Sequence, residues 1–241
     1  MCRERAAKRP RDFSTDATIA GAAAQPFRGT RPLLQRPRWP GGCAFGMMKR
    51  QVNGKLSVNL DHLLECWRLE ISNKQRPGRR TSLLFNVLRR ARKDNKLRFL
   101  FSFRLAQYLD ACGGLLRRHA RRMQQRLNLK YAVDIDIGAQ IAPGLRIAHL
   151  PGVVITRHVS IGRNFFVRQN CSIGIKTLGL AEYALRIGDN VSMGANSCIV
   201  ADRIEIGDNV VIGAMSLVTR DIPDGMTFYN PRQVEMRPRE T

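Results

Sequence analysis

A six-residue repeat in the C-terminal half of the chain constrains its fold more than any other feature. Pairs of an aliphatic residue and Gly share this spacing, with interruptions, at Ile137-Gly138, Ile161-Gly162, Ile173-Gly174, Ile187-Gly188, Met193-Gly194, Ile206-Gly207 and Ile212-Gly213. A second apolar series has the same spacing at Ile141, Ile147, Val153, Val159, Phe165 and Cys171. An α-helix repeats every 3.6 residues and a strand every two, so neither element alone produces these interleaved series.

Short strands that meet at tight corners account for this pattern. Asp189-Asn190 and Asp208-Asn209 supply residues that tolerate turn conformations. Such a chain winds into a solenoid, in which each coil buries its inward side chains against the next coil at a spacing of about 4.8 Å. A β-sandwich with glycines placed by chance is the alternative, and the constancy of the repeat over many units disfavours it.

The segment before the repeat has helical periodicity, from about Ser57 to Lys130. Apolar residues at spacings of three and four predict four amphipathic helices, with Gly113-Gly114 ending the third. Basic residues are concentrated here: residues 47–133 have a net charge of +16, residues 1–46 have +6, and residues 134–241 are neutral. We expect a basic helical domain at 47–133, a solenoid at 134–223 and a C-terminal tail at 224–241.

Residues 1–46 are rich in Arg, Pro, Gly and Ala and lack apolar periodicity. This composition is typical of a disordered basic arm. The alternative is a mis-assigned translation start, because Met47-Met48 follows directly. The basic helices could lie on an anionic membrane surface, which would make this a peripheral membrane protein. Alternatively, they pack within the domain or between subunits and expose their charged face to solvent. We favour the second interpretation.

Several classes of protein are disfavoured by composition. No apolar run approaches the length of about 18 residues needed to cross a bilayer, and no secretory signal is visible, which predicts a cytoplasmic protein. The six cysteines form no CxxC pair and no metal-ligand spacing, so we expect reduced thiols and no bound metal. A noncatalytic protein that binds nucleic acid or lipid is the third functional hypothesis, and confinement of the charge to one half argues against nucleic acid.

The repeat region resembles a known family. The segments DIDIGAQIAPGLRIAHLPGVVI (134–155), SIGRNFFVRQNCSIG (160–174), IGDNVSMGANSCIV (187–200) and IEIGDNVVIGAMSLVTRDIP (204–223) are similar to the hexapeptide-repeat acyltransferases. Within these, the chain resembles the serine acetyltransferase branch, and its relatives in polysaccharide biosynthesis most of all. The resemblance implies an α+β fold, with an N-terminal helical domain followed by a left-handed parallel β-helix. It also implies a homotrimer with active sites between subunits, and acetyl-CoA as the donor substrate.

His149 is the leading candidate for catalysis. The first series places it at an inward position that is otherwise apolar, between Pro143 and Ile155. A buried imidazole requires a polar partner, so this placement points to function. The alternative is a corner histidine that faces solvent where the coil is irregular. The resemblance implies that the His of IAHLPGVVI is the general base, which takes the proton of an acceptor hydroxyl.

Asp134 is the candidate for orienting His149. It lies fifteen residues earlier, nearly one coil away, and the resemblance assigns the carboxylate of the DI segment to this role. A simple surface carboxylate is the alternative interpretation of Asp134, and Asp136 is the alternative orienting group.

The resemblance also implies contacts to the donor. The pantetheine arm would contact Gly174, Ile175, Ala195 and Ala214, although the family often has Gly where Ile175 stands. Lys176 and Arg220 are candidates for the CoA phosphates, and ordinary surface charges are the alternative. The other histidines, His62, His119 and His158, are expected to have no catalytic role.

The acceptor is predicted from two departures from the family. Serine acetyltransferases carry an acidic residue before the catalytic His and a second His before a later coil, where this chain has Ala148 and Ala184. Both groups hold serine in those enzymes, so their loss favours a hydroxyl of a sugar or polysaccharide precursor as acceptor. O-acetylation of serine for cysteine biosynthesis is the alternative function.

Overall fold

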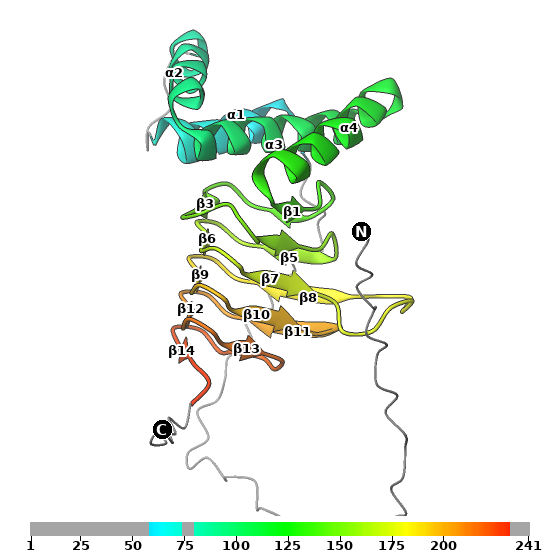
Figure 1. Ribbon diagram of the computed structural model, residues 1–241, viewed down its shortest axis with the longest axis vertical. Helices are drawn as coiled ribbons and strands as arrows, with labels where there is room; N and C mark the ends of the chain where they lie inside the picture. Colours follow the sequence, from blue (N-terminus) through cyan, green and yellow to red (C-terminus); the bar gives the residue numbers. More distant parts are fainter. Residues whose placement is uncertain (1–57, 74–79, 232–241) are drawn as a thin grey trace, which may run out of the picture. The chain divides into compact units, whose positions relative to one another are not determined.

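The computed structural model describes residues 58–73 and 80–231 (Figure 1). Helices come first: α1 (Leu60–Cys66), the π-helical η1 (Trp67–Ser72), α2 (Arg80–Lys93), α3 (Asn95–Cys112) and α4 (Gly114–Tyr131). The helical periodicity is therefore confirmed within the described ranges. Asn59 and Asp94 begin α1 and α3 as N-caps, because each side chain accepts a hydrogen bond from a backbone N–H of the first turn.

Fourteen short strands follow the helices within these ranges, and they form three parallel sheets. Sheet A contains β1 (Asp134–Ile135), β4 (Val154–Ile155), β7 (Ser172–Gly174), β10 (Cys198–Val200) and β13 (Leu217–Val218). Sheet B contains β2 (Gln140–Ile141), β5 (Val159–Ile161), β8 (Ala184–Ile187) and β11 (Arg203–Ile206). Sheet C contains β3 (Arg146–Ile147), β6 (Phe166–Val167), β9 (Ser192–Met193), β12 (Val211–Ile212) and β14 (Thr227–Phe228).

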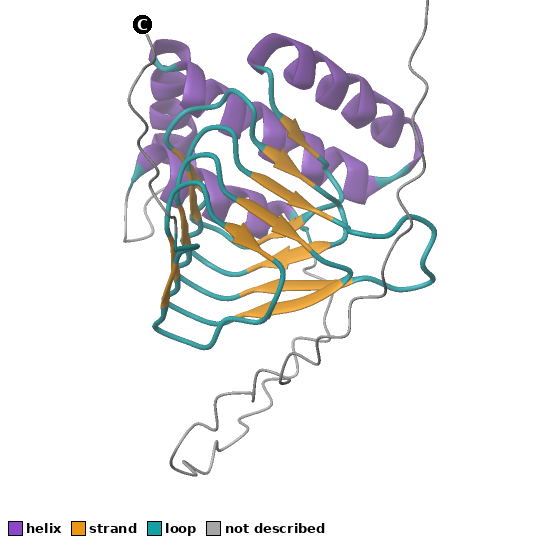
Figure 2. Ribbon diagram, turned by 60° about the horizontal axis from the view of Figure 1, so that its bottom comes forward, coloured by secondary structure: helices purple, strands orange, loops and turns teal. Residues whose placement is uncertain are grey.

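The first four coils each contribute one strand to each sheet in turn, the last contributes β13 and β14 to sheets A and C, and the coils follow one another around a common axis (Figure 2). The predicted architecture, helices followed by a left-handed parallel β-helix, is confirmed. Parallel pairing extends past Pro223, because β14 pairs with β12 within the segment that we expected to be a tail. Residues 1–57, which include the predicted N-terminal arm, and residues 74–79 and 232–241 lie outside the described residues.

Both apolar series of the repeat point into the core. Ile161 and Val167 of one series and Val159 and Phe165 of the other are at most 2% exposed. Asparagines occupy the corners with positive φ, and their side chains bond from coil to coil, as from Asn164 to Asn190 at 3.0 Å. Asn tolerates this left-handed conformation, and its side-chain amide bonds to the amide of the equivalent Asn in the next coil. The corners therefore stack in register.

A buried ion pair joins the helices to the first coil. Arg104 of α3 donates to the Glu70 carboxylate, to Ile141 O at 2.8 Å and to Ala142 O at 3.1 Å. Glu70 Oε1 in turn accepts the backbone N–H groups of Gly144 and Leu145, both at 3.1 Å. These contacts cover the first coil, and they give its backbone N–H and C=O groups hydrogen-bond partners that water would otherwise supply.

Candidate functional site

His149 lies on the surface, at the corner between β3 and β4. Ile147 and Leu150 are 6% and 7% exposed, whereas the His149 side chain between them is exposed to solvent. The expectation that His149 fills an inward position is therefore wrong, and the solvent-facing alternative is observed. The physical reason is a corner with two extra residues. The inward residues are Leu145 and Ile147 before the corner, and Val153 and Ile155 after it. Equivalent inward positions are therefore eight residues apart across this corner, rather than six.

The backbone around His149 is held firmly. Gly152 N donates to Ala132 O at 2.8 Å, and Asn170 N donates to Pro151 O at 3.1 Å. Gly152 has a φ of +74°, and a Cβ at this position would lie 2.2 Å from Asn170 Oδ1. Only glycine fits a corner that combines this conformation with such close contact, so the loop presenting His149 is fixed by its own sequence.

Asp134 does not contact His149 in the described part of the chain. Its Oδ1 accepts a hydrogen bond of 2.8 Å from the side-chain amide of Asn128, and its backbone pairs with Val154. The alternative group, Asp136, forms a salt bridge of 3.1 Å with Arg157 and accepts Gly138 N. Asp134 lies on β1, whose neighbour β4 begins just after the His149 corner, so the two residues share a region of the surface without a hydrogen bond.

The predicted donor-binding residues divide between two edges of sheet A. Ala195 and Ala214 follow β9 and β12 and therefore share the corner column of His149, which follows β3. The others lie at the opposite edge, at the end of β7 and just after β7 and β13; these are Gly174, Ile175, Lys176 and Arg220. A Cβ added to Gly174 would have no neighbour within 4 Å, so that edge is open to a ligand.

A loop projects from the second of these edges, between β7 and β8. The Asp202 carboxylate accepts the backbone N–H groups of Lys176 at 3.0 Å and Thr177 at 2.8 Å, and these hydrogen bonds, that of Thr177 above all, lower the pKa of Asp202. The Tyr183 hydroxyl donates to Thr177 O at 2.8 Å. The ring of His158 packs on Tyr183 with centroids 4.6 Å apart. This surface histidine therefore helps to position the loop that carries Ile175 and Lys176.

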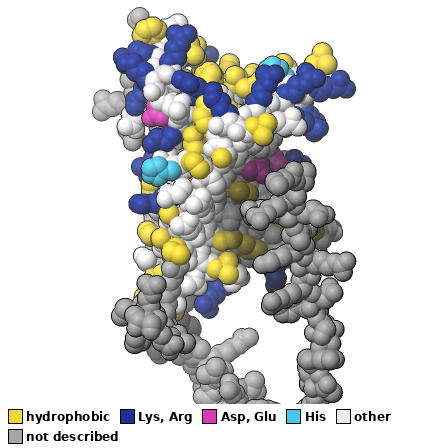
Figure 3. Space-filling model, in the orientation of Figure 1, with side chains coloured by type: hydrophobic (Ala, Val, Ile, Leu, Met, Phe, Trp, Pro, Cys, Tyr) yellow, Lys and Arg dark blue, Asp and Glu magenta, His cyan; other side chains and the backbone are white. Residues whose placement is uncertain are grey.

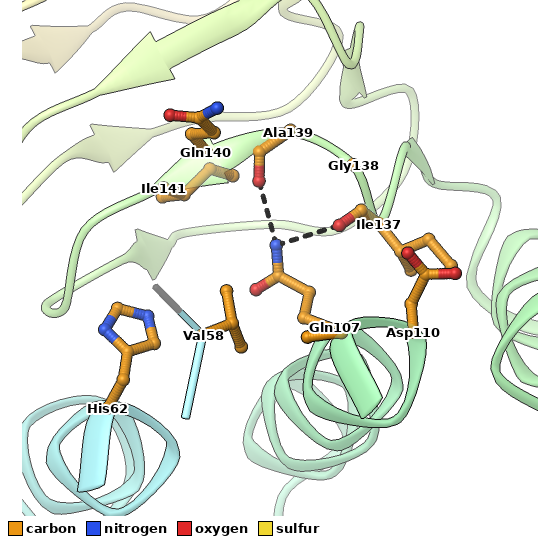
Figure 4. Close-up of a pocket in the computed structure, with 10 residues that line it drawn as sticks. Val58, His62, Gln107, Asp110, Ile137, Gly138, Ala139, Gln140 and Ile141 are labelled. Carbon is orange, nitrogen blue, oxygen red and sulfur yellow. Dashed lines mark hydrogen bonds between the residues drawn. The ribbon is translucent and has the colours of Figure 1, made fainter. Parts of the chain in front are cut away.

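A cavity of about 180 Å³ lies between the helices and the first coil (Figure 4). Gln107 donates to Ala139 O at 2.9 Å and to Ile137 O at 3.3 Å along its wall, and His62 and Asp110 also line it. Burial, above all, lowers the pKa of His62. None of the predicted catalytic or donor-binding residues lines this cavity, so it is separate from the candidate site.

Three residues near His149 were missed by the sequence analysis. The guanidinium carbons of Arg146 and Arg168 lie 5.4 and 5.6 Å from the centroid of the Phe166 ring, on the outer face of sheet C. The sequence offered one indication: exposed and buried residues alternate along a strand, and these residues stand next to the buried Ile147 and Val167. Only the register Arg146↔Phe166 brings them together, and that register depends on the irregular corner between the coils.

No group of three or more metal-ligating side chains occurs within residues 58–73 and 80–231. None of the helices in these ranges is long and apolar enough to cross a membrane.

Comparisons with known proteins point to one enzyme class. Serine acetyltransferase 1, chloroplastic, from Arabidopsis thaliana is 41% identical over 101 residues, which are 42% of this chain and 32% of the relative. The soybean serine acetyltransferase complexed with serine has a TM-score of 0.57 at 23% identity, over 73% of this chain and 68% of that one. The Brucella abortus serine acetyltransferase in complex with coenzyme A has a TM-score of 0.52 at 23% identity, over 57% and 54%.

No family model matches the chain. The chain spans about a third of the length of the curated relatives that it matches, and the structural likeness shows the fold. These relatives are serine acetyltransferases, so they give no support to the expected proximity to polysaccharide enzymes.

Proposed function

We propose that this chain is an acetyl-CoA-dependent O-acetyltransferase. One observation carries the proposal: an exposed, rigidly held histidine lies on a β-helix similar to serine acetyltransferases, in the same corner column as Ala195 and Ala214. A surface position suits a general base, because the imidazole must reach a substrate hydroxyl.

The chemistry is transfer of an acetyl group from sulfur to oxygen. His149 takes the proton of the acceptor hydroxyl as that oxygen attacks the thioester carbonyl carbon. The new C–O bond forms, the C–S bond breaks, and the imidazolium returns the proton to the departing CoA sulfur. Asp134 would stabilise the imidazolium once a change of side-chain rotamer exchanges Asn128 for His149 as its partner.

The donor would lie along sheet A. Backbone groups at Gly174, Ala195 and Ala214 would contact the pantetheine arm, and Lys176 and Arg220 would meet the phosphates. These residues occupy two edges of the sheet, so a donor that contacts both edges crosses its outer face or lies between two chains. Exposed Val154 and Leu217, at 41% and 51%, give that face an apolar character that suits the proposed homotrimer.

We propose L-serine as the first acceptor, because the named relatives are serine acetyltransferases. A sugar hydroxyl is the second candidate, favoured by Ala148 and Ala184, which leave the charged ends of serine without the acidic and imidazole partners implied by the family resemblance. A charged hydrogen bond contributes about 1.5–3 kcal/mol, so the two acceptors are separable by rate.

The test is thiol release from acetyl-CoA by the purified full chain, with millimolar L-serine compared with mono- and oligosaccharides. His149→Ala is expected to lower the rate by about 10²–10⁴-fold, because it removes the general base. His119→Ala is the matched control, since His119 is an exposed histidine on α4. Near-normal turnover by His149→Ala would assign the chemistry to another residue. Saturable turnover of a sugar but not of serine would select the second acceptor.

A further inference from the structure

A cluster of cationic side chains lies beside His149, with two arginines on the outer face of sheet C and one lysine at the start of α3. We call Lys96, Arg146, Phe166 and Arg168 the sheet C patch. Both guanidinium groups contact the Phe166 ring, and Lys96 Nζ donates to Ala148 O at 3.3 Å. In Figure 3, Lys and Arg side chains lie near a histidine at the edge of the molecule where Figure 1 shows β3 and β6.

The positive charge of the sheet C patch is not neutralised within the described residues. No carboxylate in residues 58–73 and 80–231 lies within 4.0 Å of the charged nitrogens of Lys96, Arg146 or Arg168. Asp94 accepts the backbone N–H of Lys96, at 2.7 Å. Glu65, on α1, pairs with Arg163 and Arg68.

The guanidinium groups of Arg146 and Arg168 pack against an aromatic ring and keep their hydrogen-bond donors unused within the described residues. Neither guanidinium donates a hydrogen bond to another group in the described part of the chain. The aromatic ring attracts both cations and limits their freedom, and it leaves N–H groups at the guanidinium edges available. Two like charges on one ring repel each other, and an anion bound between them would relieve that repulsion.

The sheet C patch is next to the proposed base. Ala148 N donates to Val167 O at 2.9 Å, which places Ala148 beside Arg168 in the neighbouring coil, and His149 follows Ala148 in the chain. The short side chain of Ala148 leaves the cations without a carboxylate at this position. A group held by the patch therefore lies near the hydroxyl that His149 deprotonates.

We propose that the sheet C patch binds a carboxylate or phosphate group of the acceptor. This inference rests on the proposed acetyltransferase function and specifies its acceptor as an anion. The carboxylate of L-serine, a uronic acid and a sugar phosphate share this chemistry. Guanidinium groups bind such planar or tetrahedral anions through paired N–H donors, which fixes orientation as well as charge.

The donor phosphates are the other source of an anion, and the geometry disfavours them. The thioester must lie at His149, on the first coil, while the alanines assigned to the pantetheine arm follow β9 and β12, on later coils. The phosphates are at the far end of that arm from the acetyl group. They would therefore lie along the stack from the sheet C patch rather than beside it.

The first experiment measures anion binding without turnover. Calorimetric titration with inorganic phosphate is carried out on the wild-type full chain, on Arg146→Gln/Arg168→Gln and on Arg186→Gln. Arg186 is the matched control, because it is an exposed arginine on the outer face of sheet B. We expect the double variant to weaken phosphate binding at least tenfold and the control to leave it unchanged. Equal binding by all three proteins would overturn the proposal.

The second experiment identifies the source of the anion. Thiol release is compared within pairs of acceptors that differ by one charged group: L-serine with L-serinamide, and glucuronic acid with glucose. We expect a preference of tenfold or more in kcat/KM for the anion, lost in Arg168→Gln and partly kept in Arg168→Lys, with an unchanged KM for acetyl-CoA. A raised KM for acetyl-CoA, with the acceptor preference intact, would assign the patch to the donor and refute the proposal.

The two experiments separate failure of the inference from failure of the function. Phosphate binding that depends on the arginines, without turnover of any acceptor, would retain the anion site and reject the acetyltransferase. Turnover that depends on His149 but not on the sheet C patch would retain the enzyme and reject the anion site.

Discussion

Replacing Glu70 by Ala should destabilise this protein far more than an ordinary surface substitution. Glu70 is 8% exposed, and its carboxylate accepts hydrogen bonds from Arg104 Nε at 3.0 Å and from the backbone N–H groups of Gly144 and Leu145. The substitution leaves Arg104, at 2% exposed, as a buried cation without a counter-charge. Breaking a buried pair in this way costs about 3–5 kcal/mol in the free energy of unfolding.

Electrostatics at Arg104 points in the same direction. Burial is the largest single influence on Arg104 and lowers its pKa, but the charge and hydrogen bond of Glu70, together with Cys66, raise that pKa above its ordinary value. In Glu70→Ala the stabilising carboxylate is gone and burial, which disfavours the charged guanidinium, is no longer offset. Because an arginine side chain keeps its proton in proteins, the variant carries the cost of a buried, unpaired cation.

The assay is thermal unfolding followed by circular dichroism. Because a change of 1 kcal/mol shifts Tm by about 2–4 °C in a domain of this size, Glu70→Ala should lower Tm by about 6–20 °C. Glu65→Ala is the matched control: its carboxylate pairs with Arg163 on the surface, and such pairs contribute about 0–1 kcal/mol.

A double variant tests the reasoning itself. Glu70→Leu/Arg104→Met removes both charges, so it should cost less than the sum of the two single substitutions. Exact additivity, or a loss below about 1 kcal/mol for Glu70→Ala, would show that the pair does not hold the helices to the first coil.

Three further predictions concern other parts of the fold. Cys66 should resist iodoacetamide at pH 8 while exposed Cys112 reacts, because burial raises the pKa of Cys66 to about 12, and peptide mass spectrometry would reveal any equal labelling. Gly194→Ala should destabilise the β-helix by about 1–3 kcal/mol in urea unfolding, because the new Cβ would lie 2.5 Å from Ala214 N, and an unchanged midpoint would contradict this close packing of coils. The loop after β7 should lose protection from hydrogen exchange only as the pH falls below about 4: the pKa of Asp202 is lowered in the folded state, so its contribution is present above the ordinary value of 3.8 and is lost through the lower folded value. Protection that is independent of pH down to 2, or unchanged in Asp202→Asn, would exclude that role.

The sequence by itself determined the two halves of this protein. Period-six spacing of Ile and Val requires stacked coils, because each inward side chain needs a partner one coil away, and period 3.6 requires helices. Both are properties of neighbouring residues, so they are readable without coordinates. The donor-binding residues at Gly174 and Ala214 remain predictions from the resemblance, since their roles depend on a ligand.

Only the tertiary structure decided where the side chains of the candidate site point. Two extra residues at the corner after Ile147 turn His149 from the expected core position to the surface, and a repeat pattern on either side of a corner does not reveal such a shift. The pairing of Arg146 with Phe166 likewise depends on the register between coils, which is fixed by core packing over the whole stack. Local sequence determines which face a residue takes within a strand, and the register of distant strands determines which residues meet.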